Sequence, residues 1–194
     1  SDFPGFDPGF TPVNIDSQLK EMYSGIILTD AEQIQEKAII GTFVETISEI
    51  NIGEQIIIGI GMPGLKTVDV RGIAAMANGP RMPHFCDNLE QILSQKGLQL
   101  AKPIHHLGSD ADYCGLGEEF AADGLFKAVT NGYYLGGGTG TADALKLKGK
   151  LVPFDDTKAW LLKSWEMMNQ DQIEMEQFAS TGRSEERRVG KECR

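Results

Sequence analysis

Residues 55–61, Gln-Ile-Ile-Ile-Gly-Ile-Gly, form an apolar run that is followed directly by the turn residues Met62-Pro63-Gly64. The run is short, rich in β-branched side chains, and has no polar face. Such a pattern is typical of a buried strand in a parallel sheet, where both faces are covered. The sequence therefore predicts an α/β fold in which residues 55–61 form a strand that ends at the Met-Pro-Gly turn.

Helices are predicted before and after this strand in the sequence. Apolar side chains recur at intervals of three and four over residues 30–47, which predicts an amphipathic helix capped by Thr29 or Asp30. Further along, Gly108-Ser109-Asp110 leads into a predicted helix over residues 111–120. This order of elements fits an α/β domain.

A hairpin is predicted in the second half of the chain. Strand candidates at residues 132–135 and 142–147 flank the glycine-rich turn 136–141, Gly-Gly-Gly-Thr-Gly-Thr. Residues 148–150 are expected to form the next turn. An apolar stripe over residues 157–177 then predicts a last amphipathic helix.

The chain is strongly acidic, with 28 Asp and Glu against 18 Lys and Arg and a formal net charge of −10. A negative surface releases no counterions from another polyanion, so neither nucleic acid nor an anionic membrane is expected as a partner. No apolar run approaches the roughly 20 residues that span a bilayer, and no signal peptide opens the sequence. We expect a cytoplasmic protein in which Cys86 and Cys114 are reduced thiols.

Both chain ends are unusual. Residues 1–12 hold three phenylalanines among proline and glycine, which favours an internal start. Residues 183–193, Arg-Ser-Glu-Glu-Arg-Arg-Val-Gly-Lys-Glu-Cys, resemble one reading frame of a sequencing-adapter oligonucleotide, the alternative being a natural charged tail. We expect the chain to be a piece of a longer protein, with residues 183–194 as an artefactual tail.

Two segments could carry chemistry. The glycines of residues 136–141 would let backbone N–H groups face an anion closely, although a plain hairpin tip explains them equally well. Residues 108–112, Gly-Ser-Asp-Ala-Asp, form a strand-to-helix junction at which a carboxylate could reach a ligand in the crevice. The alternative is that Asp110 or Asp112 only caps the helix.

Four segments together, in order and at similar spacing, resemble the ROK (repressor, ORF, kinase) family of sugar kinases. The resemblance covers roughly residues 56–150. The matching segments are Gly59-Ile60-Gly61-Met62-Pro63-Gly64, Asn78-Gly79-Pro80, Ser109-Asp110-Ala111-Asp112 with Glu118, and Leu135-Gly136-Gly137-Gly138-Thr139-Gly140.

This resemblance implies an actin-like ATPase (ribonuclease H-like) fold, here incomplete. It would place an N-terminal sugar-kinase domain lacking its first strands at residues 1–122 and the start of a second domain, with the phosphate-loop hairpin, at residues 123–182. The implied activity is phosphorylation of a hexose or N-acyl-hexosamine, with ATP and Mg²⁺ as cofactors. We expect the parent protein to form a homo-oligomer and the 194-residue chain to be inactive.

The family's functional residues carry over to matching positions. Asp110 matches the catalytic base, which takes the proton of a sugar hydroxyl as the oxygen attacks the γ-phosphate. The sugar-binding set is Gly64, Asn78, Gly79, Ser109, Asp110 and Glu118. The phosphate-binding set is Gly137, Gly138, Thr139 and Gly140. No metal-ligand set is predicted, because adjacent residues such as His105 and His106 point to opposite faces of a strand.

Two departures from the family pattern affect these expectations. Ser109 stands where the family has asparagine, so one hydroxyl donor replaces an amide and sugar preference is expected to differ. Asp143 follows the glycine turn and would bring negative charge near a triphosphate unless it points away or binds Mg²⁺. Two alternatives stay open, a sugar-sensing transcriptional regulator of the same family and a non-catalytic sugar-binding or scaffold relative.

Overall fold

The computed structural model describes residues 5–50, 55–137, 141–157, 159–164 and 166–176. The chain forms two compact units, Ser1–Gly108 and Ser109–Arg194. The helix that begins at Asp110 belongs to the same unit as the hairpin that follows it, and the domain boundary predicted after residue 122 is not tested by this division. The assignment of these units to two kinase domains stays a prediction.

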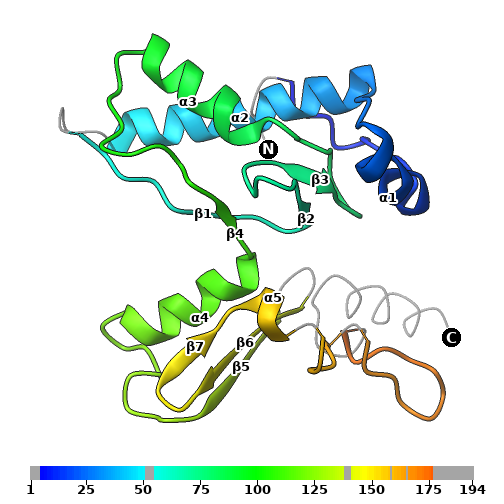
Figure 1. The fold of residues 1–194 in the computed structure, drawn as a ribbon, viewed down its shortest axis with the longest axis vertical. Helices are drawn as coiled ribbons and strands as arrows, with labels where there is room; N and C mark the ends of the chain where they lie inside the picture. Colours follow the sequence, from blue (N-terminus) through cyan, green and yellow to red (C-terminus); the bar gives the residue numbers. More distant parts are fainter. Residues whose placement is uncertain (1–4, 51–54, 138–140, 158, 165, 177–194) are drawn as a thin grey trace, which may run out of the picture. The chain divides into compact units, whose positions relative to one another are not determined.

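The first unit combines three helices with two short pairs of strands (Figure 1). Strand β1 pairs in parallel with β4, and β2 pairs with β3 in antiparallel fashion. Helices α2 and α3 lie side by side. The elements are α1 (Ile15–Ser24), α2 (Asp30–Ile50), β1 (Ile60–Gly61), β2 (Leu65–Lys66), β3 (Ile73–Ala75), α3 (Phe85–Gln95) and β4 (Leu107–Gly108).

Helix α2 begins with a reciprocal cap. The Thr29 Oγ1 accepts a hydrogen bond from the backbone N of Glu32 at 3.2 Å, and the Glu32 Oε2 accepts one from the backbone N of Thr29 at 2.9 Å. This pair satisfies two N–H groups that have no partner inside the helix. Of the two cap candidates that the sequence offered, Thr29 is therefore the cap, and the predicted helix is confirmed.

The predicted buried strand over residues 55–61 is only partly correct. Its parallel pairing is confirmed, but the strand proper is Ile60–Gly61, and Ile56 forms an isolated bridge with Leu100. Ile58 and Ile60 pack against the core, whereas the side chain of Ile57 is 73% exposed. Side chains alternate across a strand, and among the described residues the face that carries Ile57 has no cover.

The core of the first unit lies where α2 and α3 meet the strands. The rings of Phe43 and Phe85 pack edge to face at a centroid distance of 5.4 Å, a favourable geometry for an aromatic pair. The buried members of this core are Ile40, Val44, Ile60, Met62, Ile73, Met76, Met82, Phe85, Cys86, Leu89, Leu93, Ile104 and Leu107.

The second unit is a helix packed on a three-stranded antiparallel sheet (Figure 1). Tyr133 faces Leu145 and Gly137 faces Thr141 in the register of the first two strands, so the predicted hairpin is confirmed. A third strand follows a tight turn in which Lys148 and Gly149 both have positive φ. The elements are α4 (Asp110–Phe120), β5 (Gly132–Gly137), β6 (Thr141–Leu147), β7 (Lys150–Val152) and α5 (Phe154–Thr157).

The predicted helix over residues 157–177 is wrong. Helix α5 ends at Thr157, and the described residues from 159 to 175 form turns, bends and one isolated bridge, Met168 to Glu174. Asn169 supplies one physical reason, because its Oδ1 accepts from the backbone N atoms of Asp171 and Ile173, both at 2.9 Å. A side chain that binds nearby backbone donors in this way competes with the helical hydrogen bonds. Within the described ranges, no helix combines the length and apolar character needed to cross a membrane.

Candidate active site

The start of α4 carries the two carboxylates that the sequence singled out. Ser109 is the N-cap residue, and its Oγ accepts a hydrogen bond from the backbone N of Ala111 at 3.2 Å. The alternative in which Asp110 or Asp112 caps the helix is therefore wrong, because the serine does so. The Ser109 Oγ also lies 3.4 Å from Asp110 Oδ1 as a donor. Asp110 is exposed, so its carboxylate is open to a ligand.

Asp112 ties the first turn of α4 to the end of the sheet. Its Oδ1 accepts a hydrogen bond from the backbone N of Phe154, the first residue of α5, at 2.8 Å. Burial raises the pKa of Asp112, and this hydrogen bond offsets the shift only in part. The two acidic residues of the junction thus differ in role, since Asp112 holds structure and Asp110 faces solvent.

Helix α4 lies along the hairpin with its N-terminal end toward the glycine end of the strands (Figure 1). Near the C-terminal end of α4, the Glu119 Oε2 accepts from the Lys146 Nζ at 2.6 Å. One turn earlier, a Cβ on Gly115 would lie only 2.7 Å from the Cβ of Ala144. The direction along α4 toward Asp110 is therefore also the direction along β6 toward Thr141. The start of α4 and the glycine end of the hairpin thus lie at the same end of the second unit.

The predicted phosphate-binding residues are described only at their edge. Gly137 is exposed and ends β5, opposite Thr141 at the start of β6. Gly138, Thr139 and Gly140 lie outside the described residues. Gly136 faces the side chain of Tyr134, whose ring occupies the space that a Cβ would take.

Asp143 points into the second unit and is paired. Its side chain is 2% exposed, and its Oδ2 accepts from the Tyr133 Oη at 3.1 Å and from the Lys163 Nζ at 3.4 Å. The Lys163 ammonium also donates to the Thr157 Oγ1 at 2.8 Å and lies 4.5 Å from the centre of the Phe154 ring. The Asp143 Oδ1 has no hydrogen-bond partner among the described residues.

A triphosphate at the glycine end would meet a mixed electrostatic environment. The Thr141 hydroxyl is bonded to the Ser164 hydroxyl, and it donates to the half-buried Glu176 carboxylate at 3.3 Å. Asp143 adds a second carboxylate, which Lys163 compensates. An anion at this end would therefore meet the Glu176 carboxylate, whereas the charge of Asp143 is compensated by Lys163.

Glu118 is placed away from the junction. It lies eight residues further along α4 than Asp110, roughly 12 Å along the helix axis. Its Oε2 accepts from the backbone N of Leu125 at 3.0 Å, and its carbonyl accepts from Phe126. The structure thus gives Glu118 a part in ordering the connection after α4, and its role in sugar binding stays a prediction.

The other three predicted sugar-binding residues belong to the first unit. Gly64 has φ +89°, and a Cβ there would lie 2.6 Å from the carbonyl oxygen of Ala75 on β3, so no other residue fits. Asn78 is exposed on the turn after β3, and Gly79 is buried against Met76. An exposed amide on an ordered turn can donate and accept hydrogen bonds, as sugar recognition requires.

Two buried side chains that sequence reasoning missed hold this turn from both sides. Before it, the Gln18 side chain accepts from the backbone N of Met76 at 2.8 Å and donates to its carbonyl at 3.1 Å. After it, Arg81 pairs with Glu32 and Glu21. Arg81 directly follows the Asn-Gly-Pro motif and could have been noticed for that reason, whereas no pattern marks Gln18.

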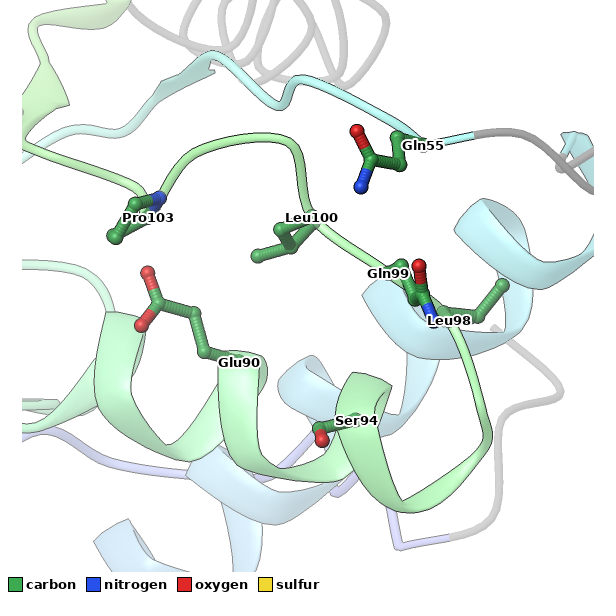
Figure 2. Close-up of a pocket in the computed structure, with 7 residues that line it drawn as sticks. All are labelled: Gln55, Glu90, Ser94, Leu98, Gln99, Leu100 and Pro103. Carbon is green, nitrogen blue, oxygen red and sulfur yellow. The ribbon is translucent and has the colours of Figure 1, made fainter.

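A separate cavity of about 330 Å³ lies between α3 and the segment that follows it (Figure 2). Its wall includes Glu90, whose carboxylate accepts from the backbone N of Ile104 at 2.6 Å and from the Arg71 Nη2 at 3.1 Å. It is lined by Gln55, Glu90, Ser94, Leu98, Gln99, Leu100 and Pro103. None of the predicted site residues lines this cavity, so it is not the candidate active site.

Several solved sugar kinases resemble this chain in structure. An inorganic polyphosphate/ATP-glucomannokinase from Arthrobacter sp. strain KM is 20% identical over 81% of this chain and 57% of that chain, with a TM-score of 0.51. A ROK hexokinase from Thermus thermophilus is 19% identical over 81% and 53%, with a TM-score of 0.48. A glucokinase from Parabacteroides distasonis is 19% identical over 81% and 46%, with a TM-score of 0.47. No family model and no curated protein matches the chain.

The likeness to the glucomannokinase shows the fold. It confirms the predicted class, an α/β arrangement of the actin-like ATPase type. The chain spans about half the length of these solved structures, with 57% for the glucomannokinase and 53% for the hexokinase. Only part of that fold is therefore present in these 194 residues.

Proposed function

We propose that this chain belongs to an ATP-dependent carbohydrate kinase of the ROK type that phosphorylates a hexose or N-acyl-hexosamine, with Asp110 as the general base. One observation carries the proposal: Asp110 is exposed in the first turn of α4, at the end of the second unit where Gly137 and Thr141 border the glycine turn. Its carboxylate has no capping duty, because Ser109 caps the helix.

In the proposed reaction, the carboxylate of Asp110 accepts the proton of a sugar hydroxyl. The hydroxyl oxygen forms a bond to the γ-phosphorus of ATP, and the bond from that phosphorus to the bridging oxygen breaks to release ADP. Mg²⁺, when bound with the nucleotide, would offset phosphate charge. Gly137, with Gly138, Thr139 and Gly140, would supply backbone N–H groups to the phosphates.

The sugar-binding set of the proposal is Gly64, Asn78, Gly79, Ser109, Asp110 and Glu118. Asn78 offers an exposed amide on an ordered turn, and Ser109 offers a hydroxyl beside the base. Gly64 and Gly79 would shape the turn, and Glu118 completes the proposed set. Because the chain spans about half the length of its structural neighbours, we propose that activity requires the full-length protein and that the 194-residue chain is inactive.

The test is sugar-stimulated ADP release by the full-length protein that carries these residues, measured across a panel of hexoses and N-acyl-hexosamines. We expect one or a few sugars to stimulate release. Sugar binding without release at any nucleotide concentration would instead favour the sugar-sensing regulator. Robust turnover by the 194-residue chain alone would contradict the proposal that further sequence is required.

A further inference from the structure

The most unusual group in the second unit is a buried carboxylate with one oxygen unpartnered. Asp143 is 2% exposed and Lys163 is 3% exposed, and the Asp143 Oδ1 has no partner among the described residues. A buried charge is tolerated only when a counter-charge or several hydrogen bonds compensate it. Here the compensation comes from the Lys163 ammonium and the Tyr133 hydroxyl, both on Oδ2.

This pair lies close to the end of the hairpin at which nucleotide phosphates are proposed to bind. Asp143 stands two residues after Thr141 on β6, roughly 7 Å along the strand, and the two side chains share one face of the sheet. The neighbouring Ser164 hydroxyl contacts the Thr141 hydroxyl, so the segment that carries Lys163 packs against the same strand end. If the charge of Asp143 were unpaired, it would lie inside the protein at this distance from Thr141 and would strongly repel a polyanion bound at the strand end.

The Lys163 ammonium is held in place by more than its carboxylate partner. It donates to the Thr157 Oγ1 at 2.8 Å and lies 4.5 Å from the centre of the Phe154 ring. Both residues belong to α5, which follows the sheet directly. The positive charge is thus anchored by the fold and would stay near the hairpin if Asp143 were neutralised.

From this geometry we propose that Lys163 is a positioning residue for nucleotide binding, which cancels the charge of Asp143 beneath the phosphate-binding end of the hairpin. The proposal rests on the kinase function proposed above. It assigns to Lys163 no contact with substrate. Its effect would be electrostatic, through Asp143, and so would appear in the affinity for ATP and not in the affinity for sugar.

The test is a charge-cancellation cycle in the full-length protein, with Mg-ATP as the probe. Lys163→Met should raise the KM for ATP and the Kd of Mg-ATP on the order of tenfold, with the KM for sugar little changed. The double variant Lys163→Met with Asp143→Asn should recover affinity to within about threefold of the unmodified protein. Lys150→Met, which removes an exposed lysine at the opposite end of the hairpin, is the matched control and should bind Mg-ATP normally.

Asp143→Asn alone keeps the proposal testable if Lys163→Met fails to fold. It removes one negative charge and leaves Lys163 in place, so it should bind Mg-ATP as tightly as the unmodified protein or up to about threefold more tightly. Weaker binding by this variant would overturn the proposal. Equal losses in Lys163→Met and in the double variant would also overturn it, because the pair would then matter only for packing.

Failure of this inference can be told apart from failure of the proposed function. If the unmodified protein binds Mg-ATP and Lys163→Met binds it equally well, the charge-cancelling role is wrong and the kinase proposal stands. If the unmodified protein binds no Mg-ATP at all, the kinase proposal falls and this inference falls with it.

Discussion

The guanidinium of Arg81 donates to both carboxylate oxygens of Glu32, through Nε at 2.7 Å and Nη2 at 2.8 Å, and each side chain is 1% exposed. The Arg81 Nη2 also donates to the carbonyl of Ile27 at 3.0 Å, and its Nη1 pairs with Glu21. Because Glu32 also belongs to the cap of α2, this ion pair fixes the start of that helix to the residues after the Asn78 turn.

Removal of Arg81 should destabilise the first unit strongly. Arg81→Met leaves the Glu32 carboxylate buried without a counter-charge, which costs about 3–5 kcal/mol in comparable pairs. We expect this loss in the free energy of unfolding, measured by urea denaturation followed by circular dichroism. Glu45→Gln, at an exposed position of α2, should change the free energy of unfolding by less than about 0.5 kcal/mol. Equal stability of Arg81→Met and the unmodified chain would contradict the buried pair.

Acidic pH should lower the free energy of unfolding, because it protonates Glu32. Burial acts to raise the pKa of Glu32, but hydrogen bonds from Arg81 and Thr29 outweigh it and hold that pKa below the ordinary value of 4.5. The resulting stability is complete above about pH 4.5 and is lost as pH falls through the lowered folded value. The difference in unfolding free energy between the unmodified chain and Glu32→Gln should therefore shrink on acidification from pH 7 to pH 3.

Glu36, on the same helix as Glu32, is a useful control because its pKa is shifted in the opposite direction. Burial raises its pKa, and a hydrogen bond from the Asn88 Nδ2 at 3.2 Å offsets this only in part. The ionised form of Glu36 therefore costs stability at neutral pH, and Glu36→Gln should gain most there and lose its advantage as pH falls. Identical pH profiles for the two glutamate variants would contradict at least one of the two assignments.

Asp112 should behave as a hydrogen-bond acceptor whose charge is dispensable. Asp112→Asn keeps an oxygen that can accept from the backbone N of Phe154. It also removes the negative charge of a half-buried carboxyl group, whose pKa is raised by burial. We expect stability at pH 7 equal to that of the unmodified chain or higher. Asp112→Ala removes the acceptor and should cost about 1–2 kcal/mol. Thermal unfolding of the three chains checks this order, and equal stability of the two variants would argue against the hydrogen bond.

The phenol of Tyr133 should ionise at a higher pH than that of an ordinary tyrosine. Burial, together with the charge of Asp143 and its hydrogen bond, raises the pKa of Tyr133 to about 12. A near-ultraviolet absorbance titration, with Tyr133→Phe to identify the signal, should show this phenol ionising after an ordinary tyrosine. Asp143→Asn should lower the pKa, because it removes the nearby negative charge and leaves only burial. An unchanged value in that variant would mean that Asp143 does not act on the phenol.

Local patterns in the sequence predicted the elements that depend on nearby residues. The Thr29 cap, the entry into α4 at Asp110 and the pairing of β5 with β6 all follow from short-range rules of capping and alternation, and all are present. The helix expected over residues 157–177 failed because periodicity takes no account of Asn169, whose side chain binds backbone donors, or of Lys163, which is drawn into the interior.

The candidate site was predictable only where its residues form a motif. Asp110 and the glycine turn could be found from their order in the chain. Arg81 and Glu32 are 49 residues apart, and Gln18 and Met76 are 58 apart, so their contacts depend on the packing of α1 and α2 against the turn. The partnership of Asp143 with Lys163 was likewise hidden, because an acidic residue after a glycine turn gives no sign of being buried.

The most direct test of the proposed phosphoryl transfer is the turnover number of Asp110→Asn in the full-length protein at saturating ATP, with sugar affinity measured on the same preparation. Asp123→Asn, at an exposed position beyond the end of α4, is the control and should turn over normally. If Asp110 takes the hydroxyl proton, turnover should fall by about 10² to 10⁴ while the Kd for sugar stays within a few-fold. Turnover within a few-fold of the unmodified enzyme would contradict the assignment of Asp110 as the base.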